Sequence, residues 1–226
     1  MKSLFLLLSM LMLVASSCAT YKVEGNTSVA TLNGKKLYIK VADNDGLIDL
    51  DSCEIVHGNF KMDGDVDSVM LGTLFIEDEG LMPIVIEAGK INISIKNTGL
   101  KVSGTPLNNK LYDFIEQKTA IEQKIIDLSH NEIQLIINGT SANEAETKTR
   151  LEIDKATDEL NRLVADFVTG NFDNLLGIQI FATYCGSLPY PTITPTIQEI
   201  MEEAPETFKN EPFVKDFIRL TTKDLE

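Results

Sequence analysis

Thiol chemistry is the first chemistry that the residue types suggest, because the chain has three cysteines, Cys18, Cys53 and Cys185. A dithiol oxidoreductase needs an attacking thiolate and a second thiol that resolves the mixed disulfide. The 226 residues hold no Cys-x-x-Cys pair, and acidic side chains flank Cys53, where they disfavour a thiolate. We therefore expect no disulfide turnover and two free, mostly buried thiols. A disulfide between Cys53 and Cys185 stays open as the alternative, because the sequence does not show whether geometry permits it.

The first cysteine follows a segment with the features of a secretory signal peptide. Lys2 gives a positive start, and residues 4–15 (LFLLLSMLMLVA) form an apolar run too short to span a bilayer stably. With the small residues directly before Cys18, this run resembles the lipobox of bacterial lipoproteins. The resemblance implies that residues 1–17 are removed and that Cys18 carries a lipid, which anchors the protein to a membrane. An ordinary signal peptide with a chance cysteine is the alternative.

The expected location follows from the residues around that cysteine. The sequence after Cys18 reads ATYK, without an aspartate directly behind the cysteine. By analogy with lipoprotein sorting, this favours the outer membrane of the cell envelope, on the side that faces the periplasm. The chain has 34 acidic and 20 basic residues and a net charge of −14, so its surface repels nucleic acid. We expect a membrane contact through the lipid anchor, an unknown envelope protein or ligand as partner, and no nucleic acid.

Other reactive residues are sparse. His57 and His130 lie in different regions without the short ligand spacings of a zinc site, so they are interpreted as a turn residue and a helix-surface residue. A calcium loop aligned on Gly46 would place Val41 and Ser52 at ligand positions, which favours a hairpin turn instead. We predict no catalytic residue, no metal and no cofactor.

One short motif is a candidate for modification. Asp67, Ser68 and Val69 resemble the acceptor for O-glycosylation of periplasmic proteins in some bacteria. The resemblance marks Ser68 as a possible O-glycosylation site.

The spacing of apolar residues changes near residue 105, from a strand pattern to a helix pattern. From Tyr21 to Gly104 apolar residues alternate with polar ones, and Asn, Asp and Gly mark turns at short intervals. This pattern predicts an antiparallel β-sandwich or open barrel over residues 18–104.

After Gly104 the apolar residues recur in steps of three, four or seven. Thr105 and Pro106 are suited to start a helix, and Asn138-Gly139 followed by Ser141 and Glu144 predicts a helical hairpin with a capping box. Shorter helices are expected over residues 172–184, over PTIQEIMEE and over PFVKDFIRLTTKD. The fold class predicted is α+β, with a signal peptide over residues 1–17, a sandwich over 18–104 and a helical region over 105–226.

Three segments in order carry a resemblance to a known family. The segment DLDSCEIVHGNFKMDG has an Asp-Ser…Gly-x-Phe…Gly pattern, and VIEAGKINISI and VSGTPLNNKLYDF follow it. The chain resembles, over about residues 21–115, the domain of unknown function at the N-terminus of thioredoxin-like thiol-disulfide oxidoreductase lipoproteins. The longer relatives continue into a thioredoxin-like domain with a Trp-Cys-x-x-Cys site. Here Leu188 stands three residues after Cys185, so no resolving thiol is present at that point.

Three classes of function remain. The expected one is a non-catalytic, lipid-anchored envelope protein that binds a protein or a ligand. An accessory subunit of a separate thiol-disulfide system is the second, and it rests on the resemblance alone. A surface glycan-binding lipoprotein is the third, although the absence of tryptophan and the small number of tyrosines count against stacking on sugar rings.

Overall fold

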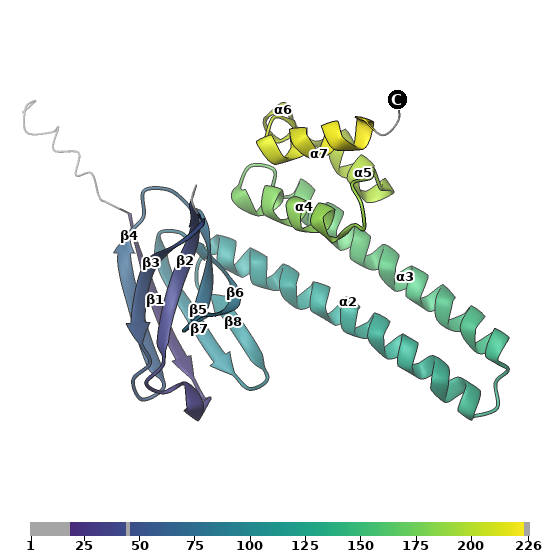
Figure 1. The fold of residues 1–226 in the computed structure, drawn as a ribbon, viewed down its shortest axis with the longest axis horizontal. Helices are drawn as coiled ribbons and strands as arrows, with labels where there is room; N and C mark the ends of the chain where they lie inside the picture. Colours follow the sequence, from purple (N-terminus) through teal and green to yellow (C-terminus); the bar gives the residue numbers. More distant parts are fainter. Residues whose placement is uncertain (1–18, 44–45, 224–226) are drawn as a thin grey trace, which may run out of the picture. The chain divides into compact units, whose positions relative to one another are not determined.

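The computed structural model describes residues 19–43 and 46–223. These residues form two compact units that divide between Thr105 and Pro106. The first unit is built from strands and the second from helices (Figure 1), so the predicted α+β class with an N-terminal sheet region is confirmed.

Two four-stranded sheets make up the first unit, in the orders β4-β1-β7-β8 and β3-β2-β5-β6. The strands are β1 (Thr20–Thr27), β2 (Lys36–Asp43), β3 (Gly46–Glu54), β4 (Asn59–Asp65), β5 (Met70–Ile76), β6 (Glu79–Ile86), β7 (Gly89–Lys96) and β8 (Gly99–Ser103), with a short 3-10 turn η1 (Ala30–Leu32) after β1. Within the described residues the sheets stay separate and do not close into a barrel. The unit is therefore a sandwich.

Strand pairing is antiparallel except at one place. β1 pairs with β4 in the antiparallel sense and with β7 in the parallel sense, with Tyr21 opposite Gly89 and Thr27 opposite Ile95. The alternating pattern predicted antiparallel pairing only. A parallel neighbour was not predicted, because β1 and β7 lie about 70 residues apart and no local turn connects them.

The β3–β4 connection shows how local sequence sets the register. His57 and Gly58 both have positive φ angles, 51° and 72°, as a two-residue type I′ turn requires. Val56 and Asn59 exchange backbone hydrogen bonds of 2.9 and 3.0 Å across the turn. The predicted turn at His57-Gly58-Asn59 is confirmed.

Alternation along the strands gives the sandwich its core. Side chains at every second position are buried, and they are mostly β-branched or leucine. Phe60 fills space over β1, because the Cβ that a larger residue would add at Gly25 falls 2.0 Å from the Phe60 ring. Gly25 thus leaves the volume that the ring occupies.

The second unit contains a long helical hairpin, α2 (Pro106–Ile137) and α3 (Ala142–Thr169), followed by α4 (Leu175–Ser187), α5 (Pro195–Glu203), α6 (Glu206–Lys209) and α7 (Pro212–Lys223). Ser141 accepts a hydrogen bond from the Glu144 amide and caps α3, as predicted. The third helix starts at Leu175 because Asn174 caps it, three residues later than predicted. The short helix α6 was not predicted.

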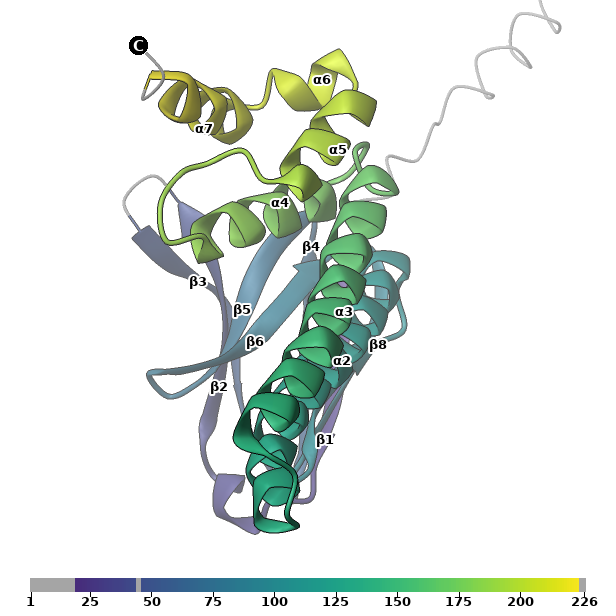
Figure 2. The same cartoon turned by 90° about the vertical axis from the view of Figure 1, so that its right-hand side faces the viewer.

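Helices α4 to α7 gather at the end of the hairpin where α3 finishes, away from the α2–α3 turn (Figures 1 and 2). Phe181 lies fully buried at the centre of their core, and its ring meets Phe208, Phe213 and Phe217 edge-on at centroid distances of 5.5, 6.3 and 6.1 Å. No helix that the structure describes is long and apolar enough to cross a membrane.

Candidate binding site

Both thiols in the described part of the chain are free. Cys53 is half-buried on β3, and burial, with a smaller contribution from Asp51, raises its thiol pKa. Cys185 is buried on α4, where burial raises its pKa to about 12. Each thiol is therefore protonated at neutral pH. The prediction of free thiols is confirmed, although Cys53 is only half-buried.

The other predicted residues lie apart from one another. Cys18 lies outside the described residues, so its lipidation stays a prediction. Ser68 is exposed in a bend between β4 and β5, where an acceptor hydroxyl is accessible, and its glycosylation likewise stays a prediction. His57 is at the tip of the β3–β4 hairpin and His130 is exposed on α2. Among residues 19–43 and 46–223, no group of three His, Cys, Asp or Glu side chains is placed to hold a metal ion.

The residues that do converge lie on the outer face of the first sheet. The register places two straight rows of polar side chains across β4, β1, β7 and β8. The first row is Lys61, Glu24, Asn92 and Ser103, and the second row is Asn59, Asn26, Ser94 and Lys101. We call these eight residues the polar rows. Each row carries a lysine on an edge strand, at opposite ends.

A shallow groove of about 310 Å³ is lined by the polar rows. Between the rows lie Phe60, Gly25 and Ile93. The Phe60 and Ile93 side chains are buried in the core, so their backbone forms the floor of the groove. The groove therefore presents only charged, amide and hydroxyl groups above a backbone floor.

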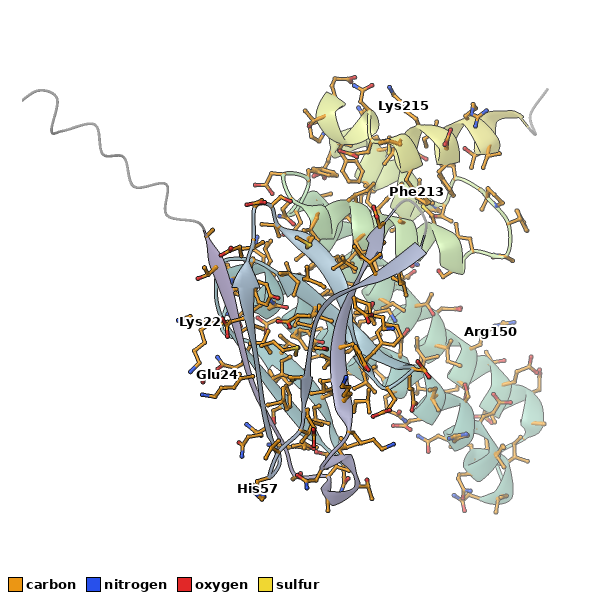
Figure 3. The ribbon with its side chains drawn as sticks, turned by 60° about the vertical axis from the view of Figure 1, so that its left-hand side comes forward. Lys22, Glu24, His57, Arg150, Phe213 and Lys215 are labelled. Carbon is orange, nitrogen blue, oxygen red and sulfur yellow. The ribbon has the colours of Figure 1, made fainter. Side chains whose placement is uncertain are left out.

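Glu24 forms ion pairs with two lysines on this face. Its carboxylate lies 3.4 Å from the Lys61 ammonium and 2.7 Å from the Lys90 ammonium. The hydrogen bond from Lys90, followed by the charge of Lys61, lowers the pKa of Glu24. Figure 3 shows Lys22 and Glu24 extending from the same side of β1.

Lysines gather on this face although the protein is acidic. Five of the eight lysines in residues 19–105 lie at its outward positions: Lys22, Lys61, Lys90, Lys96 and Lys101. The acidic residues at the outward positions of the same strands are Glu24, Asp63 and Asp65. The outer face of the first sheet thus has an excess of positive charge, which attracts anions locally.

The polar rows were not predicted from the sequence. A usable sign was present, because polar residues occupy every second position in KVEGN, NFKMD and KINIS. That alternation identifies outward residues, but it does not tell which strands lie side by side. The parallel β1–β7 pair brings Glu24 beside Asn92, and only the structure shows this.

The positions that carry the family resemblance have mainly structural roles. The Tyr21 hydroxyl donates a hydrogen bond of 3.0 Å to the Asp51 carboxylate on β3 and so links the two sheets. A Cβ at Gly64 would lie 2.9 Å from that hydroxyl, so Gly64 makes room for the Tyr21 ring. Lys90 differs, because its ammonium reaches the outer face and pairs with Glu24.

The fold and the groove define a class: an α+β protein whose N-terminal sandwich carries a polar groove on the lysine-rich outer face of one sheet. Within this class, residues 21–111 match the family model described as a domain of unknown function, DUF4369. The chain therefore carries this domain, the one that the sequence motifs indicated, and the groove lies wholly within it. A comparison with curated proteins gave no match.

Proposed function

We propose that this protein is a non-catalytic binding protein of the cell envelope, anchored by a lipid on Cys18, and that the outer face of the β4-β1-β7-β8 sheet is its binding surface. The observation that carries the proposal is the groove lined by the polar rows. Eight polar side chains from four strands meet there, although no packing demand of the core requires them.

The state of the two thiols supports a binding role over a redox role. Disulfide exchange requires a thiolate, and burial raises the pKa of both Cys53 and Cys185. The two residues also belong to different units of the chain. A role as accessory to a separate thiol-disulfide enzyme rests on the family resemblance alone.

Lysine footprinting tests the proposed surface without knowledge of the ligand. An amine-reactive acetylating reagent is applied to intact cells and to the purified full chain, and the labelling of each lysine is compared by mass spectrometry. Lys61 and Lys101 line the groove, and Lys215 on α7 is an exposed control. We expect Lys61 and Lys101 to be labelled severalfold less in cells than in the purified protein, and Lys215 to be labelled equally.

Equal ratios for all three lysines would remove the outer face of the first sheet as the binding surface. Protection of Lys215 together with Lys61 and Lys101 would have the same consequence, because it would show general shielding in the cell. The comparison of ratios within each lysine cancels differences in intrinsic reactivity, including those caused by ion pairs.

The anchor is tested by a separate substitution. Cys18→Ala removes the sulfur that would carry the acyl chain, so metabolic labelling with palmitate should disappear and the mature protein should move to the soluble envelope fraction. Undiminished labelling of the variant would disprove lipidation at this residue. Neither result depends on the groove, so the two parts of the proposal are tested independently.

A further inference from the structure

We infer that the groove lined by the polar rows binds an acidic oligosaccharide, one whose sugar rings carry carboxylates and which is held by hydrogen bonds and ion pairs instead of stacking on aromatic rings. This inference rests on the proposed function, because it names the ligand of the proposed surface. The arguments come from the chemistry of the groove, its dimensions and the residues that it lacks.

The amide and hydroxyl groups match a hydroxyl-rich ligand. Asn26, Asn59 and Asn92 each offer both a donor and an acceptor, and Ser94 and Ser103 offer hydroxyls. Adjacent ring hydroxyls of a sugar also donate and accept, so they can satisfy both halves of an amide. The Ser94 hydroxyl already donates a 3.5 Å hydrogen bond to Asn26, which is long enough for a ligand hydroxyl to replace it.

The lysines add a requirement for negative charge. Lys61 and Lys101 lie on the two edge strands, β4 and β8, three strand spacings apart across the sheet, or roughly 14 Å, and one row apart along it. A single small anion does not reach both. A short chain of acidic sugar rings does, with carboxylates at two points and hydroxyls over the amides between them.

Glu24 shows which anion fits. Its carboxylate pairs with Lys61 at 3.4 Å and with Lys90 at 2.7 Å, so these ammonium groups accept a carboxylate, and a ligand carboxylate would compete with Glu24 for Lys61. All arginines lie in the helical unit, which leaves the groove without the planar fork that suits phosphate. Lysines that already pair with a carboxylate, in a groove without arginine, favour a singly charged acid group.

A protein partner fits this face less well. Protein interfaces have an apolar centre with aromatic anchors. Within residues 19–43 and 46–223, none of the large apolar side chains that are exposed lies on β1, β4, β7 or β8. The face therefore offers no apolar centre for such an interface.

The test measures binding of a galacturonic acid trimer to the full chain by isothermal titration calorimetry at low ionic strength. The methyl-esterified trimer is the matched neutral ligand, because it keeps the rings and hydroxyls and loses the charge. We expect the acidic trimer to bind at least tenfold more tightly than the ester, and added salt to weaken its binding.

Substitutions locate the ligand. Lys61→Gln combined with Lys101→Gln should weaken binding of the acidic trimer about tenfold, and Lys215→Gln should leave it unchanged. Glu24→Gln should strengthen binding about threefold, because it removes a like charge and releases Lys61 and Lys90. Circular dichroism of each variant verifies that the fold is kept. All four residues are exposed or half-buried, so we expect the fold to tolerate the changes.

Three outcomes would overturn the inference: equal binding of the ester, binding that Glu24→Gln weakens, or no binding of either trimer. If lysine footprinting nevertheless shows Lys61 and Lys101 protected in cells, the outer face stands as the binding surface and only the acidic oligosaccharide is wrong. If footprinting shows no protection, the proposed surface itself fails.

Discussion

The outward face of the first sheet is polar, whereas the outward face of the α2–α3 hairpin carries exposed apolar side chains. On β1, β4, β7 and β8 the buried positions are mostly apolar, and the outward positions are largely polar. On the hairpin half that lies near its turn, Ile126, Ile133 and Ile137 are exposed to 48%, 57% and 69%. The sheet has a second sheet to cover its inner face, whereas near the hairpin turn α2 and α3 pack only on each other within the described part of the helical unit, because α4 to α7 lie at the other end of α3.

This difference in exposed apolar side chains reflects where the core of each unit lies. In the helical unit the large, fully buried side chains gather where α4, α5 and α7 pack, around Phe181, whereas the fully buried residues of α3 nearer the hairpin turn, Ala145 and Ala156, are small. Farther along α2, Ile125, Leu128 and Leu135 are only half-buried, although their spacing predicted a buried face. The hairpin is thus secured at one end. Substitutions should reveal this gradient, and the following are ordered from the largest expected effect to the smallest.

Phe181→Ala should cost the most, about 3–5 kcal/mol of unfolding free energy. Phe181 is fully buried and contacts three other aromatic rings, so its removal leaves a cavity that the helices cannot close. Urea unfolding followed by the helical circular dichroism signal measures the loss. Phe213→Ala is the matched control, because Phe213 is 40% exposed and should cost much less. Equal losses would contradict a core centred on Phe181.

Tyr21→Phe should cost about 1–2 kcal/mol, because it leaves the Asp51 carboxylate without its donor across the sandwich. The ring and its packing against Gly64 remain. Thermal unfolding of the variant measures the effect, and Tyr38→Phe, at an outward position of the other sheet, is the control. A loss no larger than that of the control would mean that the Tyr21–Asp51 hydrogen bond adds nothing to stability.

The Tyr21–Asp51 link shows which features a sequence can predict. Strands and helices were predicted well because each depends on residues close in the chain: alternation in KLYIKVAD, the Ser141 cap, the turn at His57-Gly58. Links between distant residues have no such local origin. Nothing near Tyr21 indicates that its hydroxyl meets Asp51, 30 residues away on the opposite sheet.

The candidate site follows the same rule. Each polar row takes one residue from each of four strands, and the order of those strands is not their order in the chain. Alternation in KVEGN and KINIS is enough to identify Glu24 and Lys90 as outward residues, but their 2.7 Å ion pair depends on the parallel β1–β7 pair. The sites that the sequence does predict, Cys18 and Ser68, each belong to a contiguous motif, and both stay predictions.

The Cys185 thiol makes stability depend on pH. Its pKa rises from 9.0 in the unfolded chain to about 12 in the folded one. The folded state therefore keeps a proton that the unfolded state loses above pH 9, so this stability is complete below pH 9 and declines as pH rises toward 12. Between pH 9 and 10 the unfolding free energy should fall by about 1 kcal/mol more in the parent than in Cys185→Ala. Parallel pH profiles of the two proteins would contradict this.

Ile133→Ala should have the smallest effect, within about 0.5 kcal/mol. The side chain is 57% exposed, so the folded state buries little of the apolar surface that the substitution removes. Ile121→Ala on the same helix is the control, and it should cost about 2–4 kcal/mol because Ile121 is buried. Urea midpoints of both variants, measured at two protein concentrations, make the comparison. A loss above 1.5 kcal/mol for Ile133→Ala that grows with protein concentration would show that a second copy covers this isoleucine in solution. The hairpin would then bury its apolar face by association, and the contrast with the first sheet would hold only for the single chain.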